Sequence, residues 1–165
     1  MFFSKYNLPF KVGLTFESSQ GFDGDFTHHG DYSFSVDLKV PEGTEVYPAR
    51  PGIVVEVEDA YRDGGIEGRF KNKDNYVFIV HRDSTVARYL HLRHKGVTVK
   101  VGQKVGRKTL IGFSGNTGYS SEPHLHFDVS SPVSGFRSKS LEFYFTDNSG
   151  NKFTTIPGET YTVDR

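Results

Sequence analysis

Residues 123–129 read Pro-His-Leu-His-Phe-Asp-Val and carry two histidines and an aspartate at alternate positions. Successive side chains of a β-strand point to opposite faces, so His124, His126 and Asp128 would share one face, roughly 6.5–7 Å from one to the next. The three apolar side chains between and after them would face the core. Two imidazoles in one space can bind a metal through one ring and transfer protons through the other. The alternative is a solvent-exposed polar strand face that happens to carry two histidines.

A carboxylate and two more histidines lie upstream. Asp37 interrupts an apolar alternation and falls on the polar face of residues 34–40, although aspartate has a poor β propensity. A carboxylate in this position suggests a metal ligand or a hydrogen-bond anchor. His28 and His29 occupy a loop rich in glycine and aspartate, where a histidine is usually solvated. Beside Asp37 and His126, one of them would complete two imidazoles and one carboxylate, the three-ligand set of a catalytic zinc site.

The composition restricts the ligands that a metal could have here. The 165 residues include seven histidines and no cysteine. The lack of cysteine excludes thiolate zinc fingers, iron–sulfur clusters, disulfides and a cysteine nucleophile. Imidazole and carboxylate are therefore the ligands left for a transition metal.

His91 is a further candidate for a polar cleft. It lies in the sequence Tyr-Leu-His-Leu of residues 89–92, within a stretch that lacks glycine and proline. The apolar pattern of this stretch suits a period of two better than 3.6, which predicts a strand. On that strand His91 would lie on the face opposite Leu90 and Leu92.

These side chains require a scaffold of strands, and strand patterns recur along the chain. Short runs rich in Val, Ile, Phe, Tyr and Thr are bounded by Gly, Pro, Asn and Asp, and few windows could hold a long helix. The predicted fold class is all-β or nearly so. The charged, glycine-rich segment 61–74 is predicted to be a mobile loop between strands, and residues 130–140 are predicted to be a connecting segment. We expect strands near residues 33–40, 44–48, 52–59, 75–82, 84–92, 97–101, 109–113, 124–130 and 141–146.

Length and charge exclude other classes of protein. Twenty basic residues balance twenty acidic residues, which argues against binding to nucleic acid or to a membrane surface. The longest apolar stretches are far shorter than the roughly 20 residues of a transmembrane span. The length predicts a single domain over residues 1–165, with 131–165 included in it. No signal peptide is visible at the amino terminus.

In chain order, these motifs resemble the lysostaphin/LytM-type zinc metallopeptidases of bacterial cell walls. His28 is followed by Asp37, then by Tyr-Leu-His-Leu at 89–92, Gly-Asn-Thr-Gly at 115–118 and Pro-His-Leu-His-Phe at 123–127. Shorter matching blocks lie between them, and the resemblance covers about residues 20–130. These blocks are Pro41–Thr44, Asn75–Val77 continuing to His81, Val101-Gly102 to Val105-Gly106, and Ile111-Gly112.

The resemblance implies a compact, mainly antiparallel β domain with a groove over a twisted sheet, of the duplicated-hybrid-motif type. It implies one Zn²⁺ per chain, held by His28, Asp37 and His126. His91 and His124 match the two further catalytic histidines of the family. The implied activity is a zinc endopeptidase that cuts peptide bonds in peptidoglycan stem peptides or cross-bridges.

The spacing of the first ligand leaves an alternative open. The commonest family form has the aspartate four residues after its histidine, whereas Asp37 lies nine after His28 and eight after His29. A longer family variant, with His-x-Gly before the aspartate segment, fits His28 as the ligand. His29 remains the alternative. Asp128 could orient a ligand imidazole from behind, but the preferred interpretation is a plain surface carboxylate.

The resemblance also bears on partners and location. It implies a peptidoglycan peptide as substrate, no nucleic acid, no transmembrane segment, and a monomer that is secreted or periplasmic. The two remaining histidines, His81 and His94, match no catalytic position and are expected to be structural or exposed.

Two other functions are alternatives to the peptidase. A catalytically inactive LytM-like module that binds or activates another cell-wall hydrolase typically loses ligands, whereas all five matching positions are kept here. A cupin-like metal protein would need an acidic residue further beyond the His-x-His pair and a later histidine. Asp128 is too close for that pattern, and no histidine follows His126.

Overall fold

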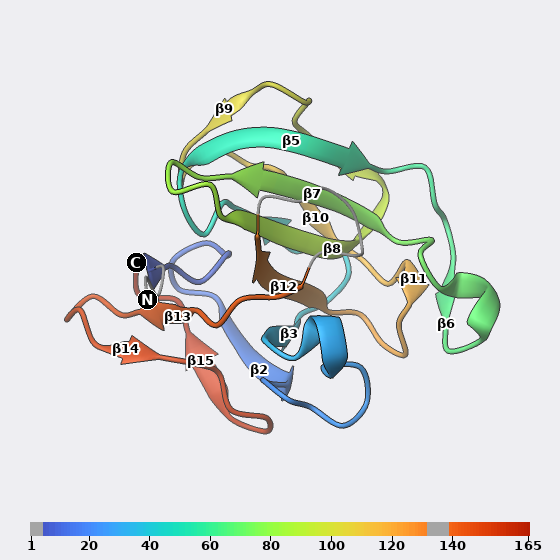
Figure 1. Ribbon diagram of the computed structural model, residues 1–165, viewed down its shortest axis with the longest axis horizontal. Coiled ribbons are helices and arrows are strands. Elements are labelled where there is room, and N and C mark those ends of the chain that lie inside the picture. The colour runs from blue at the N-terminus through green and yellow to red at the C-terminus, as the bar shows by residue number, and fades with distance from the viewer. Residues whose placement is uncertain (1–4, 132–138) are drawn as a thin grey trace.

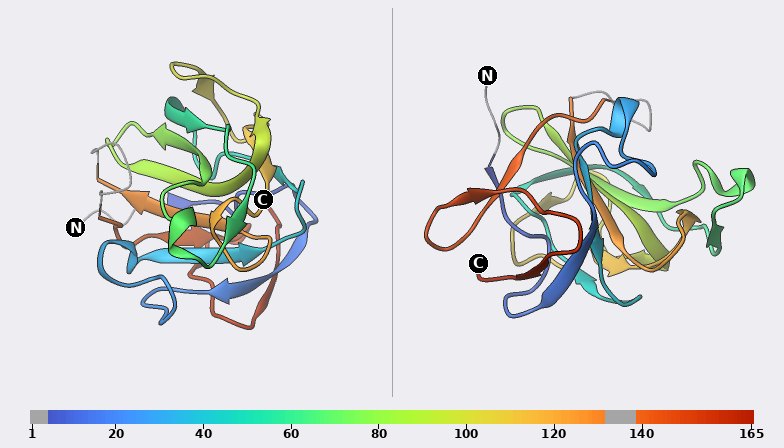
Figure 2. Two further views of the ribbon diagram at one scale, coloured as in Figure 1. Left: turned by 90° about the vertical axis from the view of Figure 1, so that its right-hand side faces the viewer. Right: turned by 90° about the horizontal axis from the view of Figure 1, so that it is seen from below.

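The structure of the chain, a computed structural model, describes residues 5–131 and 139–165. These residues form fifteen strands and two short 3₁₀ helices, η1 (Gly30–Tyr32) and η2 (Gly68–Phe70). The predicted all-β fold is confirmed. Ten of the strands make one large sheet, whose twist is visible in Figure 1 and in the two turned views of Figure 2.

The pairings within the large sheet are antiparallel. Its main path runs β15 (Thr160–Thr162), β2 (Thr15–Gln20), β3 (Ser35–Lys39), β12 (Leu125–Ser130), β8 (Val86–Val97), β7 (Asn75–Val80), β5 (Gly52–Glu58) and β9 (Lys104–Val105). β10 (Gly112–Ser114) joins this path at β8 and also pairs with β4 (Glu45–Val46).

Two small sheets flank the large one and contain the parallel ladders. β13 (Tyr144–Thr146) pairs in parallel with β1 (Lys5–Tyr6) and antiparallel with β14 (Lys152–Phe153). β6 (Gly64–Gly65) pairs in parallel with β11 (Gly118–Tyr119). Figures 1 and 2 show this last pair at one end of the molecule, beside η2.

The core lies on one face of the central strands. Leu125, Phe127 and Val129 of β12 are buried there, as the alternation of the sequence predicts. Phe127 packs against Phe143 and Phe145, whose ring centroids lie 5.2 and 5.7 Å from its own. The carboxyl-terminal segment therefore supplies part of the same apolar core.

Several predicted strand boundaries differ from the structure. The expected strands at 44–48 and 109–113 are the shorter β4 and β10. The expected strands at 84–92 and 97–101 are replaced by the continuous β8 (Val86–Val97), and residues 98–101 lie outside any strand. The segment 61–74 contains β6 and η2, because the glycines of β6 allow close pairing with β11. The expected strand at 141–146 is shortened to β13. Most of the predicted connection 130–140 lies outside the described residues.

β2 is a strand that the sequence reasoning missed. Its residues read Thr-Phe-Glu-Ser-Ser-Gln, which contain little of the aliphatic signal of a strand. The buried positions are Phe16, Ser18 and Gln20, so two of its three inward side chains are polar. Burial of the alternate residues comes from pairing with β3, which is a tertiary effect.

We expect Phe145→Ala to test whether the carboxyl-terminal segment folds with the rest as one domain. Phe145 is fully buried and contacts the rings of Phe127, Phe143 and Phe153. Its truncation should lower the free energy of unfolding by about 3–5 kcal/mol in one cooperative urea transition. Ile156→Ala, an exposed position in the same segment, should change it by less than about 0.5 kcal/mol. A separate second transition would contradict a single domain.

Candidate functional site

The centre of the site is the pairing of β3 with β12. Asp37 lies directly opposite His126 in this antiparallel register, and both side chains point away from the core. The two side chains are almost completely buried, and His126 Nδ1 lies 3.0 Å from Asp37 Oδ1. Neighbouring strands thus present an imidazole and a carboxylate to each other without any loop being involved.

His28 joins this pair from the loop that precedes η1. The ring is fully buried, and its Nδ1 donates to the Gly21 carbonyl oxygen at 2.8 Å. That bond places the proton on Nδ1 and leaves the lone pair on Nε2. Nε2 lies 3.1 Å from Asp37 Oδ1 and has no hydrogen-bond partner in the described part of the chain.

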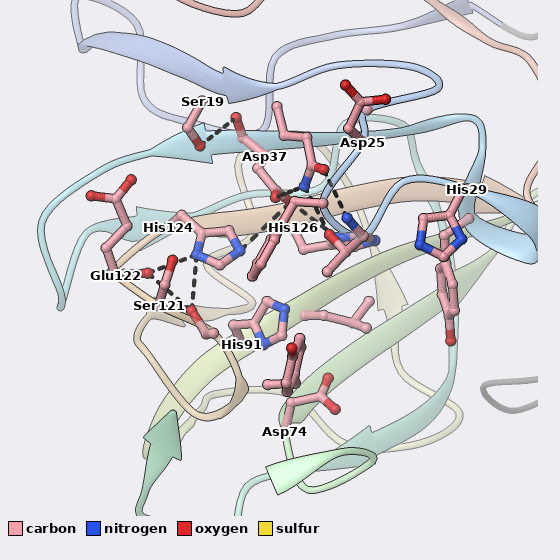
Figure 3. Close-up of a pocket in the computed structure, with 18 of the residues that line it drawn as sticks. Ser19, Asp25, His29, Asp37, Asp74, His91, Ser121, Glu122, His124 and His126 are labelled. Atoms are coloured by element: carbon pink, nitrogen blue, oxygen red, sulfur yellow. Dashed lines mark hydrogen bonds and ion pairs between the residues drawn. The ribbon is translucent and has the colours of Figure 1, made fainter. Parts of the chain in front are cut away.

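These three residues fit a metal ion. One ligand atom from each of His28, Asp37 and His126 lies within 4.8 Å of the others, and all three side chains are buried. Two imidazole nitrogens and one carboxylate oxygen are a donor set that suits zinc. The buried Nε2 of His28, with its lone pair directed at another acceptor, is a polar atom that a cation would satisfy. His29 is exposed and lies apart from this group in Figure 3.

Gln20 of β2 holds the second oxygen of Asp37. Its Nε2 donates to Asp37 Oδ2 at 2.8 Å, while its Oε1 accepts the backbone N–H of Thr27 at 2.9 Å. One amide therefore connects the aspartate to the loop that carries His28. The sequence reasoning missed Gln20, because β2 gives no strand signal and an isolated glutamine gives no metal-site signal.

Asp128 orients the other side of His126, and the preferred interpretation as a surface carboxylate is wrong. The side chain is fully buried, and its Oδ2 lies 3.0 Å from His126 Nε2. Arg88, on the neighbouring strand β8, donates through Nε and Nη2 to both oxygens of this carboxylate. Asp128 lies within the sheet, where β3 and β8 pair on either side of β12 and exclude water.

The charges around this centre shift the pKa values of its groups. Burial opposes a negative charge on Asp37, but the imidazoles of His124, His126 and His28 hold its pKa well below the usual range. Burial likewise disfavours a charged His126, but Asp128 and Asp37 raise its pKa to about 9. Two carboxylates flanking one imidazole make the position attractive for positive charge.

His124 and His91 form a second pair of imidazoles beside the first group. Their ring centroids lie 4.7 Å apart, and both line the same cavity (Figure 3). His124 Nδ1 donates to the Glu122 carbonyl oxygen at 2.7 Å, and His91 Nδ1 donates to the Thr117 carbonyl oxygen at 2.7 Å. Each ring therefore keeps its Nε2 lone pair. Burial and the neighbouring His124 and His126 hold the pKa of His91 well below its usual value.

A β-bulge, which the sequence pattern does not predict, brings His91 to this face. Strict alternation would place His91 on the face opposite Leu90, yet both residues line the cavity. Asn75 pairs with Leu92 and Tyr76 with Leu90, so His91 is the extra residue on β8. Its φ of 64° lies in the left-handed region, which interrupts the alternation and turns the imidazole toward the cavity.

Two buried side chains hold this bulge in place. The Thr117 hydroxyl donates to the Leu92 carbonyl oxygen at 2.7 Å and accepts the Asn75 backbone N–H at 3.1 Å. The Asn75 amide group donates to the same Leu92 carbonyl oxygen at 3.2 Å and to that of Tyr61 at 2.8 Å. These contacts support a backbone conformation that is unfavourable by itself for a residue with a side chain.

The site opens into one cavity of about 880 Å³ over the sheet. The 21–29 loop, β11 and the end of segment 61–74 form its walls, and Asp37, His91, His124 and His126 line it. Phe26 stacks on Tyr119 across these walls, with ring centroids 6.1 Å apart. The predicted groove is therefore present, with its walls formed by segments that carry little strand signal.

Asp74 is another cavity residue that the sequence reasoning missed. It immediately precedes β7 and is 4% exposed, and its Oδ2 has no hydrogen-bond partner among the described residues. Burial raises the pKa of this carboxyl group to about 6, against weaker opposing effects of backbone N–H groups, His126 and Arg88. The only sequence signal is its place at the end of a charged loop.

Fold and site together define a β-sheet protein with a buried His-Asp-His group and two further histidines in a groove. Residues 31–137 match Peptidase family M23, and the chain belongs to this family.

The similarity to individual proteins agrees with this family membership. The chain is 41% identical over 93 residues to the peptidoglycan DD-endopeptidase ShyA of Vibrio cholerae, covering 56% of this chain and 19% of that protein. It is 37% identical over 99 residues to the glycyl-glycine endopeptidase ALE-1 of Staphylococcus capitis, covering 60% and 25%. The structure of lysostaphin from Staphylococcus simulans matches with a TM-score of 0.58 and 25% identity, over 77% of this chain and 47% of that one.

The matched region is a small part of these relatives. The chain spans about a fifth to a quarter of the length of the two curated relatives named above. Within the described residues, no helix is both long enough and apolar enough to cross a membrane.

We expect Asp74→Asn to stabilise the protein above pH 6. A folded-state pKa of about 6 exceeds the ordinary value of 3.8, so wild-type stability should fall as the pH rises from about 4 to 6. Two pKa units correspond to about 3 kcal/mol. Urea unfolding should therefore show the variant about 2–3 kcal/mol more stable at pH 7.5, with a much smaller difference at pH 4. A difference independent of pH would contradict a buried charge at Asp74, and Asp59→Asn serves as the control.

Proposed function

We propose that this chain is a zinc-dependent endopeptidase that hydrolyses peptide bonds in peptidoglycan, in stem peptides or cross-bridges. The observation that carries the proposal is the buried group of His28, Asp37 and His126, whose ligand atoms lie within 4.8 Å of one another, beside a groove that Asp37 and His126 line. Membership of a peptidase family agrees with this chemistry.

The proposed zinc ligands are His28 through Nε2, Asp37 through Oδ1 and His126 through Nδ1, since these atoms face one another. Zinc bound there would lower the pKa of water from roughly 15.7 to about 7 and would polarise the scissile carbonyl. Gln20 and Asp128 would hold the ligands in orientation through Asp37 Oδ2 and His126 Nε2.

His91 and His124 are the proposed proton-handling residues. Both keep an Nε2 lone pair, because the Nδ1 protons are donated to backbone carbonyl oxygens, and both residues line the cavity. One would accept the proton of the attacking water, and the other would donate to the developing oxyanion or to the leaving amine. The depressed pKa of His91 keeps this ring neutral at physiological pH, as a proton acceptor must be.

The named relatives support a class of substrate but not a particular peptide bond. ShyA and ALE-1 are named for different peptide bonds, so they support a peptidoglycan peptide without selecting one bond. Such a substrate would place the protein outside the cytoplasm, secreted or in the periplasm, and we propose that it acts there as a monomer.

Zinc content should distinguish the ligands from their neighbours. We expect close to one zinc per purified chain by elemental analysis, and His28→Ala or His126→Ala should lose it. His29→Ala should retain the metal, because His29 is exposed and lies outside the group of donors. Zinc retained by His28→Ala and lost by His29→Ala would reverse the ligand assignment.

Digestion of peptidoglycan tests the activity itself. Mass analysis should show new peptide fragments from sacculi with diaminopimelate cross-links or with glycine bridges, and a chelator should abolish their release. His91→Ala and His124→Ala should keep the zinc and lose about 10²–10⁴-fold in rate. His94→Ala, a half-buried histidine that does not line the cavity, is the matched control.

A zinc-loaded protein that releases no fragments would favour the alternative, an inactive LytM-like module that activates another hydrolase. Full activity in both His91→Ala and His124→Ala would contradict the roles assigned to these two histidines.

A further inference from the structure

Asp74 differs from the other two buried carboxylates of the site, which face imidazole or guanidinium groups. Asp37 faces three imidazoles, and Asp128 is paired with Arg88. Asp74 forms no ion pair among the described residues, and its Oδ2 accepts no hydrogen bond. Backbone N–H groups bond the carboxyl group, but a buried carboxylate without a counter-ion is unfavourable, so its presence in a groove points to a cationic group that arrives with a ligand.

The position of Asp74 is fixed closely by its surroundings. Gly118 of β11 has a φ of 78°, and a Cβ there would lie 2.4 Å from the Cβ of Asp74. The glycine therefore lets β11 pass directly over the aspartate, beside His91. Figure 3 shows the Asp74 carboxyl group just beyond His91 in the same pocket, within reach of a substrate that contacts the histidine.

Asp74 lines the same cavity as His91, so a ligand in the groove can approach its carboxyl group.

The acidic lining of the rest of the cavity favours a cation. The carboxylates of Asp23 and Asp25 also line the cavity, Asp25 on the side opposite Asp74 in Figure 3, and neither forms an ion pair among the described residues. Lys71 is the one lysine or arginine among the lining residues, and its Nζ lies 5.6 Å from the centre of the Tyr119 ring. Tyr119 lines the cavity and directly follows Gly118, which abuts Asp74, and an aromatic ring near a carboxylate is a favourable environment for an ammonium group.

We propose that Asp74 is a specificity-determining residue that binds a primary ammonium group of the peptide substrate. This inference rests on the proposed endopeptidase function and narrows its substrate to peptides with a free amine near the cleaved bond. The amine can belong to a side chain or to the peptide amino terminus, because both present the same ammonium chemistry to the carboxylate.

The test uses a soluble peptide that contains the bond identified by digestion of peptidoglycan. Three forms are compared: unmodified, acetylated only at the amino terminus, and acetylated only at the side-chain amine. For the zinc-loaded wild type, acetylation of one of these amines should lower kcat/KM at least tenfold, and the affected form identifies the source of the ammonium.

In Asp74→Asn, kcat/KM for the unmodified peptide should fall at least tenfold, and acetylation should alter kcat/KM less than twofold. Asp74→Ser is a second variant in case the first fails to fold. Asp59→Asn removes a carboxylate outside the cavity and should retain the full discrimination.

Equal cleavage of all three forms by the wild type would overturn the ammonium subsite while leaving the endopeptidase function intact. Full discrimination in a folded Asp74 variant would overturn the role of this residue. No peptide fragments from sacculi would overturn the proposed function and the subsite that rests on it.

Discussion

The register of β3 against β12 is the constraint on which the rest of the site depends. It places Asp37 opposite His126, and the same two strands turn Leu38 and Phe127 into the core. Because side chains alternate with a period of two, a slip of one residue would exchange the polar and apolar faces. Aromatic packing around Phe127 opposes such a slip. The hydrophobic face of the sheet therefore positions the polar groups on its other face.

Three buried carboxylates differ in their surroundings, and this difference suggests three roles. Asp37 faces three imidazoles, which suits a metal ligand. Asp128 is held by Arg88 and orients His126. Asp74 has no partner on Oδ2, and burial raises the pKa of this group to about 6. A charge left unpaired near a bound substrate is destabilising for the fold, and the binding of a cation would remove that penalty.

Much of the scaffold could be predicted because aliphatic and aromatic runs mark the central strands. The runs near 52–59, 75–82 and 124–130 correspond to β5, β7 and β12. β2 could not be predicted, because its buried residues include Ser18 and Gln20, which become inward-facing only when the strand pairs with β3. For the same reason Gln20, which holds Asp37, has no signal in the sequence.

By itself the sequence determined the alternation that puts His124, His126 and Asp128 on one face, and the lack of cysteine that leaves imidazole and carboxylate as metal ligands. The tertiary structure decided that Asp128 is buried, because only the folded sheet brings Arg88 beside it. It also decided the direction of His91. A left-handed residue interrupts the period of two, and it is held by contacts from Asn75 and Thr117, which lie far away in the chain. Local alternation can be read from neighbouring residues, whereas a bulge depends on which distant groups satisfy its backbone.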